Sequence, residues 1–179
     1  MAYVAPPNFV SGAVLTEANL DVLSDDIAYL YGATSAQAFS GCQVSRNAAT
    51  NISNNSSSAI TWTAEAIDVG NWWTSGTNIV VPASAIPSGY TTIMLMVTAR
   101  TRFAANGTGL RRLGAMKNGT GFGWVSTTGI TGDTTDLSII EFVTAVVGDI
   151  VTLELFQNSG GVLAASETQI TVARYAPIS

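Results

Sequence analysis

The 179-residue sequence predicts an all-β protein, a sandwich or barrel of short strands preceded by one short helix. Two observations favour this fold class. From residue 39 onward, apolar and polar residues alternate with a period of two, which is typical of half-buried strands. Turn-rich stretches such as KNGTG, VGD and NSGG interrupt the alternation at short intervals. Before residue 39 the apolar spacing is helical, so we expect a single β-domain with an N-terminal appendage.

Residues 1–13 are predicted to form an extended arm, which Pro6 and Pro7 stiffen. The segment has no basic region and is therefore not expected to be a signal peptide. Its apolar side chains would suit an arm that lies in a groove of another protein and attaches the chain to a particle. These side chains are Tyr3, Val4, Phe9 and Val10. An ordinary frayed terminus is the competing interpretation, and the sequence favours neither.

Residues 14–32 are predicted to form a helix, with Thr16 as its N-cap and Gly32 at its C-terminal end. The apolar positions are spaced three and four apart, as in a heptad seam. They are Leu20, Leu23, Ile27 and Leu30. A seam of about two heptads is marginal in isolation, so it needs a partner. Either the helices of several copies form a bundle or the helix lies on its own domain. The first interpretation is preferred and assigns these residues to oligomerisation.

A small-residue linker, 33–38, is expected to lead into the β-domain, 39–179. The polar stretch 51–58 is predicted to be a loop. Ten strands are predicted, at 39–46, 59–62, 65–69, 78–81, 91–102, 110–117, 123–126, 137–144, 150–156 and 168–175.

The composition is low in charge, with 11% charged and 47% hydrophobic residues. An average protein has about 25% charged residues. A monomer with so much apolar surface would tend to aggregate, so we expect part of it to be buried between subunits. No apolar run approaches the ~20 residues of a membrane span. A net charge of −5 and a single lysine, Lys117, disfavour nucleic-acid binding.

The sequence contains no histidine, the commonest general base and a frequent metal ligand. The single cysteine, Cys42, allows no intrachain disulfide and is expected to be a small strand residue. Glu141 and Glu154, on neighbouring predicted strands, could form a glycosidase pair, but nothing in the sequence sets their separation. We therefore expect no enzymatic activity, no catalytic residue, no cofactor and no metal.

Trp72 and Trp73 are adjacent in a predicted loop. Paired tryptophans can stack on sugars, and they can equally pack in a core or an interface. Packing is the preferred interpretation. Both residues nevertheless remain candidates for ligand binding.

Arg100 and Arg102 are expected to share a strand face, with Arg111 and Arg112 on the next strand. Such a cluster could bind phosphate or an acidic sugar, which makes Arg100 and Arg102 the other two ligand candidates. Salt bridges to Glu141, to Glu154 or to another subunit are the preferred interpretation.

An ordered series of short motifs runs through the β-domain. The motifs are Ala38-Phe39-Ser40, Ile79–Pro82, Ser88-Gly89-Tyr90, Lys117-Asn118-Gly119 and Gly148-Asp149-Ile150-Val151. In order and spacing they resemble the C1q/TNF-like jelly-roll family, over residues 37–177. The resemblance implies a ten-stranded sandwich that assembles as a compact homotrimer. No collagen repeat precedes the domain, and Ile170 and Val172 replace an aromatic residue of the closing strand, so receptor and calcium functions are not carried over.

Residues 8–12, 14–20 and 23–27 resemble the opening segment of small bacteriophage virion proteins. Together with the jelly roll, this resemblance implies a non-enzymatic homotrimeric structural protein on the exterior of a virion. It would be a capsid decoration protein or a head fibre, attached by its arm and helix to the major capsid protein or another virion protein. The alternative is a tail or fibre receptor-binding module that recognises a host-surface glycan.

Overall fold

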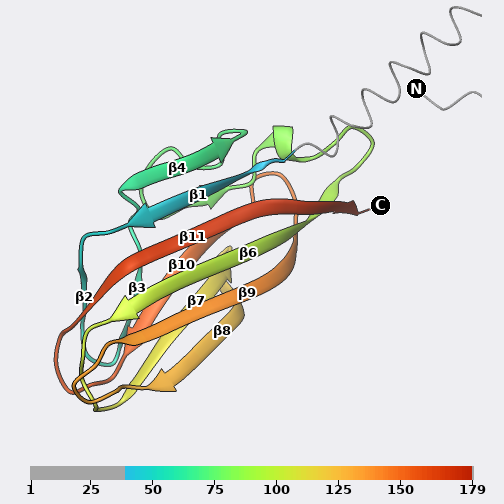
Figure 1. Ribbon diagram of the computed structural model, residues 1–179. Coiled ribbons are helices and arrows are strands. Elements are labelled where there is room, and N and C mark those ends of the chain that lie inside the picture. Colours follow the sequence, from blue (N-terminus) through green and yellow to red (C-terminus); the bar gives the residue numbers. More distant parts are fainter. Residues whose placement is uncertain (1–38, 179) are drawn as a thin grey trace, which may run out of the picture. The chain divides into compact units, whose positions relative to one another are not determined.

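The computed structural model describes residues 39–178, which form a sandwich of two antiparallel β-sheets (Figure 1). The predicted all-β jelly-roll sandwich is thereby confirmed. The predicted arm (1–13), the helix with its heptad seam (14–32) and the linker (33–38) lie outside the described residues.

The first layer, sheet A, has the order β4-β1-β11-β6-β9, and β2 pairs with β11. Its strands are β1 (Gly41–Arg46), β2 (Thr50–Ile52), β4 (Ala64–Val69), β6 (Thr92–Phe103), β9 (Thr135–Ala145) and β11 (Leu163–Ile178). The second layer, sheet B, has the order β3-β10-β7-β8, and β5 pairs with β10. Its strands are β3 (Ser56–Ala59), β5 (Ile79–Val80), β7 (Leu110–Lys117), β8 (Thr120–Thr128) and β10 (Ile150–Gln157). A single 3-10 turn, η1 (Ala83–Ala85), precedes β6.

The core lies between the two sheets and follows from the period-two pattern. On β6, Leu95 and Val97 are fully buried, whereas Met96 between them faces outward. β10 contributes Leu153 and Leu155 from the opposite layer, also fully buried. Successive side chains of a strand point to opposite faces of the sheet. Each sheet therefore turns an apolar face toward the core and its other face toward the exterior.

Two predictions between residues 51 and 62 were wrong. The predicted polar loop 51–58 carries all or part of the short strands β2 and β3, whose chain reverses at Asn55 with a positive φ of 56°. Of the predicted strand 59–62, only Ala59 belongs to a strand, as the last residue of β3, and residues 60–62 lie in no strand. Its apolar residues Ile60 and Trp62 are buried because their side chains fill the core. The alternation of apolar and polar residues at 60–62 therefore reflects the burial of side chains in the core and not strand pairing.

β11 is much longer than its predicted span, 168–175. It pairs with β1, β2 and β6, so it lies at the centre of sheet A. The pairing with β6 shifts register between Ser166 and Gln169 and again between Arg174 and Ala176. Such bulges move side chains to the other face, which interrupts the period-two pattern and conceals the strand in the sequence.

Two motifs of the sequence resemblance contact each other. Asn118 and Gly119 have φ angles of 50° and 78° and form the two-residue turn between β7 and β8. The Asn118 amide donates to Asp149 Oδ1 at 2.7 Å, and the Val146 N–H donates to Asp149 Oδ2 at 3.0 Å. Burial raises the pKa of Asp149, but these donors and Lys117 at 3.5 Å outweigh it and hold the pKa below its usual value.

Candidate functional site

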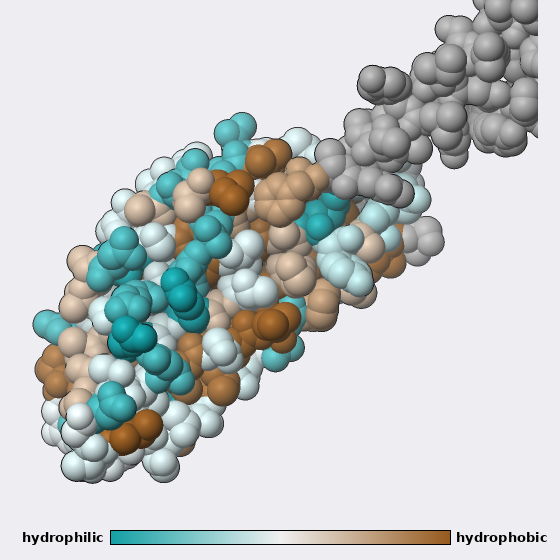
Figure 2. Space-filling view, in the orientation of Figure 1, coloured by the Kyte–Doolittle hydropathy of each residue, from teal (hydrophilic) through white to brown (hydrophobic). Residues whose placement is uncertain are grey.

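The outer face of sheet A carries a patch of apolar side chains, here called the sheet A patch. It consists of the exposed Ile140, Phe142 and Tyr175 and the half-buried Met94 and Met96. Ile140 is 68% exposed, Phe142 50% and Tyr175 64%. Figure 2 shows a band of hydrophobic side chains on this face beside a group of hydrophilic ones.

The strand register places a row of apolar residues across sheet A, in which Ala173 and Gly41 are buried. Phe142 lies opposite Met96, and Met96 lies opposite Ala173. The row continues through Gly41 to Val69 on the edge strand β4. Val69 is 48% exposed, so apolar groups extend from one edge of the sheet to the other.

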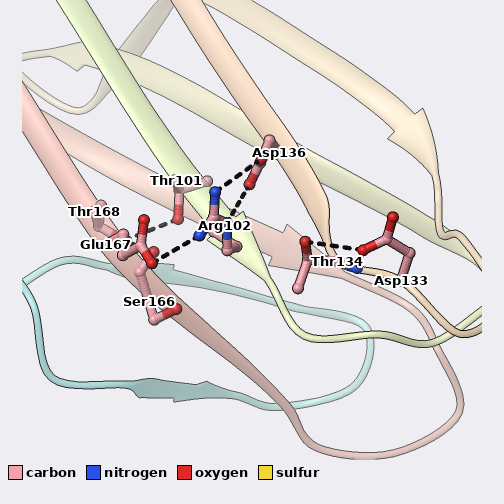
Figure 3. Close-up of polar contacts among 8 residues, drawn as sticks. All are labelled: Thr101, Arg102, Asp133, Thr134, Asp136, Ser166, Glu167 and Thr168. Atoms are coloured by element: carbon pink, nitrogen blue, oxygen red, sulfur yellow. Dashed lines mark hydrogen bonds and ion pairs between the residues drawn. The ribbon is translucent and has the colours of Figure 1, made fainter.

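The polar part of the same face contains Arg100 and Arg102. Arg102 donates to both oxygens of Asp136, at 2.8 and 3.2 Å, and to Glu167 at 2.8 Å (Figure 3). The hydrogen bond with Asp136 raises the pKa of Arg102 and lowers the pKa of Asp136. Arg100 Nε donates to Gln169 Oε1 at 3.1 Å. Both arginines therefore have intramolecular acceptors.

The predicted partners Glu141 and Glu154 were wrong, and so was the expected cluster of the four arginines. The acidic partners of Arg102 are Asp136 and Glu167, not Glu141 or Glu154. Arg111 and Arg112 follow in the chain but lie on β7 in the other sheet. Arg111 is fully buried and donates to the carbonyls of residues 106, 108 and 110.

Trp72 belongs to the core, with 1% of its surface exposed. Its indole donates to Ser40 Oγ at 3.2 Å and to the Val69 carbonyl at 3.1 Å. The backbone N–H groups of Trp72 and Trp73 both donate to the Asp68 carboxylate, at 2.8 and 3.0 Å. Trp73 is partly buried against the core. These contacts give both residues a packing role.

The acidic pair is divided between the two sheets, and the cysteine is buried. Glu141 lies on β9 in sheet A and Glu154 on β10 in sheet B, so the expectation that the two strands are neighbours was wrong. The Cys42 thiol is fully buried, and burial raises its pKa to about 12. Within residues 39–178, no group of three or more His, Cys, Asp or Glu side chains is placed to hold a metal ion.

The outer face of sheet B carries an aromatic cluster that the sequence did not reveal. The Arg112 guanidinium lies 4.5 Å from the ring centroid of Trp124 and 4.8 Å from that of Phe156. Trp124 is 43% exposed, and its ring covers Gly114 and Gly121. The available signal was the glycine-rich run Gly121-Phe122-Gly123 directly before a strand tryptophan.

In the described part of the chain, no helix has the length and apolar character needed to cross a membrane.

No protein-family model matches this sequence, and no curated protein does. Solved structures match over most of the chain at low sequence identity. The globular domain of zebrafish complement 1qA is 12% identical, has a TM-score of 0.55 and aligns over 78% of this chain and 99% of its own. Murine APRIL is 11% identical, with a TM-score of 0.55 and coverages of 76% and 99%. The Eiger TNF of S. frugiperda is 9% identical, with a TM-score of 0.51 and coverages of 79% and 95%. The described domain thus has a C1q/TNF-like jelly-roll fold.

Proposed function

We propose that this protein is a non-enzymatic structural protein that forms homotrimers through the sheet A patch and decorates the exterior of a virus particle. The observation that carries the proposal is the patch itself. Ile140, Phe142 and Tyr175, all at least half exposed, lie on one face of one sheet.

Burial of the sheet A patch would stabilise an assembly. Single exposed apolar residues are common on monomers, but contiguous patches mark interaction surfaces. Aromatic residues and methionine are enriched at such interfaces, and the patch contains only these types and Ile140. Each large apolar side chain contributes about 1.5–3 kcal/mol when fully buried. Within the described residues β9 pairs only with β6, so its other edge has no strand partner in its own sheet.

The stoichiometry and the location rest on sequence resemblance. The C1q/TNF-like motifs imply a homotrimer, and residues 8–27 resemble the opening of bacteriophage virion proteins. A trimer would bring three copies of the N-terminal segment to one place, so weak contacts with a capsid or another virion protein would combine into firm attachment. The absence of histidine supports a role without catalysis.

A co-sedimentation experiment tests the attachment. The full chain should sediment with particles of its own virus, whereas a variant that lacks residues 1–32 should remain in the supernatant. Particle binding that is unchanged by the deletion would contradict the proposed attachment. The candidate helix is tested separately by Leu23→Ser with Ile27→Ser, which should weaken association between copies.

The second candidate function, recognition of a host-surface glycan, is favoured by one specific observation. This observation is the cluster of Trp124 and Arg112 on sheet B. The residues that the sequence suggested for glycan binding are less suitable, since Trp72 is buried and Arg102 is paired with acids.

A further inference from the structure

Arg112 differs from the other arginines in having no hydrogen-bond acceptor within the part of the chain that the structure describes. Five of the six arginines donate a hydrogen bond to an oxygen: Arg46, Arg100, Arg102, Arg111 and Arg174. Arg112 donates to none within residues 39–178, and its Nε is buried without a partner. A guanidinium carries five N–H donors and stays charged at any pH of interest. The N–H donors of Arg112 therefore have no acceptor within the described residues.

Two aromatic rings hold this guanidinium in place. Trp124 on β8 and Phe156 on β10 lie on either side of β7, and both rings are within 5 Å of Arg112 Cζ, at 4.5 and 4.8 Å. Stacking engages the flat faces of the guanidinium and leaves its in-plane N–H groups for hydrogen bonds. A planar fork held in one orientation suits a carboxylate, which it binds through two parallel hydrogen bonds.

Trp124 provides an apolar surface beside that charge. Glycine at 114 and at 121 allows the indole to lie against the backbone of β7 and β8, because a Cβ at either position would overlap the ring. Among the large apolar side chains on the strands of sheet B, only Trp124 and Val80 on β5 are exposed. Apart from the Phe156 ring, the neighbouring positions on this face are polar or glycine: Ser126 lies opposite Arg112, and Glu154 lies opposite Gly114.

These features fit a small polar ligand better than a protein. A stable protein interface buries about 800 Å² on each side, with several apolar side chains at its centre. One exposed indole among polar groups is too small for that role. An aromatic surface with a few convergent polar groups is the composition of a small-molecule site.

We propose that the outer face of sheet B binds an acidic saccharide. The sugar carboxylate accepts two hydrogen bonds from Arg112, and the sugar ring lies against the exposed part of Trp124. The Glu154 carboxylate accepts hydrogen bonds from sugar hydroxyls. This site deepens the second candidate function, on which it rests, and is independent of the structural role proposed for the sheet A patch on the opposite sheet.

Iodide quenching of tryptophan fluorescence provides a direct assay on the full chain. Of the four tryptophans, Trp62 and Trp72 are buried and Trp73 is partly buried, so quenching reports mainly on Trp124. The probes are oligosaccharides that end in glucuronate or N-acetylneuraminate, with glucose- and galactose-terminated oligosaccharides as neutral counterparts. An acidic probe should protect Trp124 from iodide, and a neutral one should not.

Substitutions assign the binding to its residues. Arg112→Gln should weaken binding of the acidic probe at least about tenfold, because a charge-assisted pair is lost. Arg112→Lys keeps the charge without the planar fork and should weaken it less. Arg100→Gln removes an arginine from the other sheet and should leave the affinity unchanged. Melting temperatures confirm that each variant is folded.

Four results would overturn the proposal. The first is the absence of binding of every acidic probe to the wild-type chain. The second is equal binding of neutral and acidic probes, and the third is unchanged binding by Arg112→Gln. The fourth is a fall in oligomeric mass for Trp124→Ala, which would assign this face to contacts between copies.

Discussion

The rings of Phe142 and Tyr175 meet over β6, with centroids 5.0 Å apart and planes at 73°. Phe142 comes from β9 and Tyr175 from β11, the two strands that flank β6 in sheet A. An edge-to-face pair is a favourable arrangement, yet half or more of each residue is exposed. The pair therefore forms a preorganised apolar surface, which suits it to contact another copy of the chain.

Replacing this pair should dissociate the assembly without unfolding the domain. The variant is Phe142→Ser with Tyr175→Ser. Each substitution should weaken association by about 2 kcal/mol, the size typical of an interface hot spot. Sedimentation equilibrium over a range of concentrations measures the change.

The matched control is Val162→Ser. Val162 is 66% exposed but lies in the loop between β10 and β11, away from the sheet A patch. Its replacement should leave the oligomeric mass unchanged. Dissociation by both variants alike would contradict the assignment of the interface.

Trp72 and Trp124 should differ strongly in their effects on stability. Trp72→Ala removes a fully buried ring and two indole hydrogen bonds, so it should lower the free energy of unfolding by about 3–5 kcal/mol. Trp124→Ala removes a ring that is 43% exposed and should cost clearly less. Urea unfolding of both variants checks the order, and equal costs would show that Trp124 is part of the core.

Asp149 should contribute stability that depends on pH. Its pKa is lower in the folded state than the unfolded value of about 3.9, so the folded state favours the carboxylate. The contribution is complete above the unfolded pKa and is lost as the pH falls through the lower folded pKa. Asp149→Asn should therefore destabilise the protein by about 1–3 kcal/mol at pH 7 and by much less at pH 3. Urea unfolding at both pH values measures this, and an equal cost at both would refute the linkage.

Gly114→Ala should displace the Trp124 ring. The added methyl group would overlap the indole, which must then move away from the strand. Iodide should quench the fluorescence of this variant more strongly than that of the wild type. Gly161→Ala serves as the control, because a Cβ at Gly161 meets nothing within 4 Å. Unchanged quenching in Gly114→Ala would show that the ring does not lie over Gly114.

Individual strands were predictable because side-chain alternation is a local property. The predicted strand 110–117 coincides with β7 (Leu110–Lys117), which pairs without a register shift over most of its length. β11 was predicted at half its length because its bulges interrupt the alternation. Local patterns therefore identify regular strands and lose those that bend.

Contacts between strands were less predictable, because this jelly roll places several pairs of consecutive strands, such as β6 and β7 or β9 and β10, in different sheets. Arg102 on β6 and Arg112 on β7 are ten positions apart but lie on opposite sides of the sandwich. Glu141 on β9 and Glu154 on β10 are likewise separated, because these two consecutive strands belong to different sheets. The exposure of a tryptophan likewise depends on what the other strands leave uncovered, so the sequence pointed to Trp72 and missed Trp124.

The mass of the full chain in solution tests the central claim most directly. Sedimentation equilibrium should give three times the 18.5 kDa of one chain. The Phe142→Ser, Tyr175→Ser variant should shift toward 18.5 kDa on dilution while its circular dichroism spectrum remains that of a β-protein. A wild-type chain that stays at 18.5 kDa at every concentration would contradict the account.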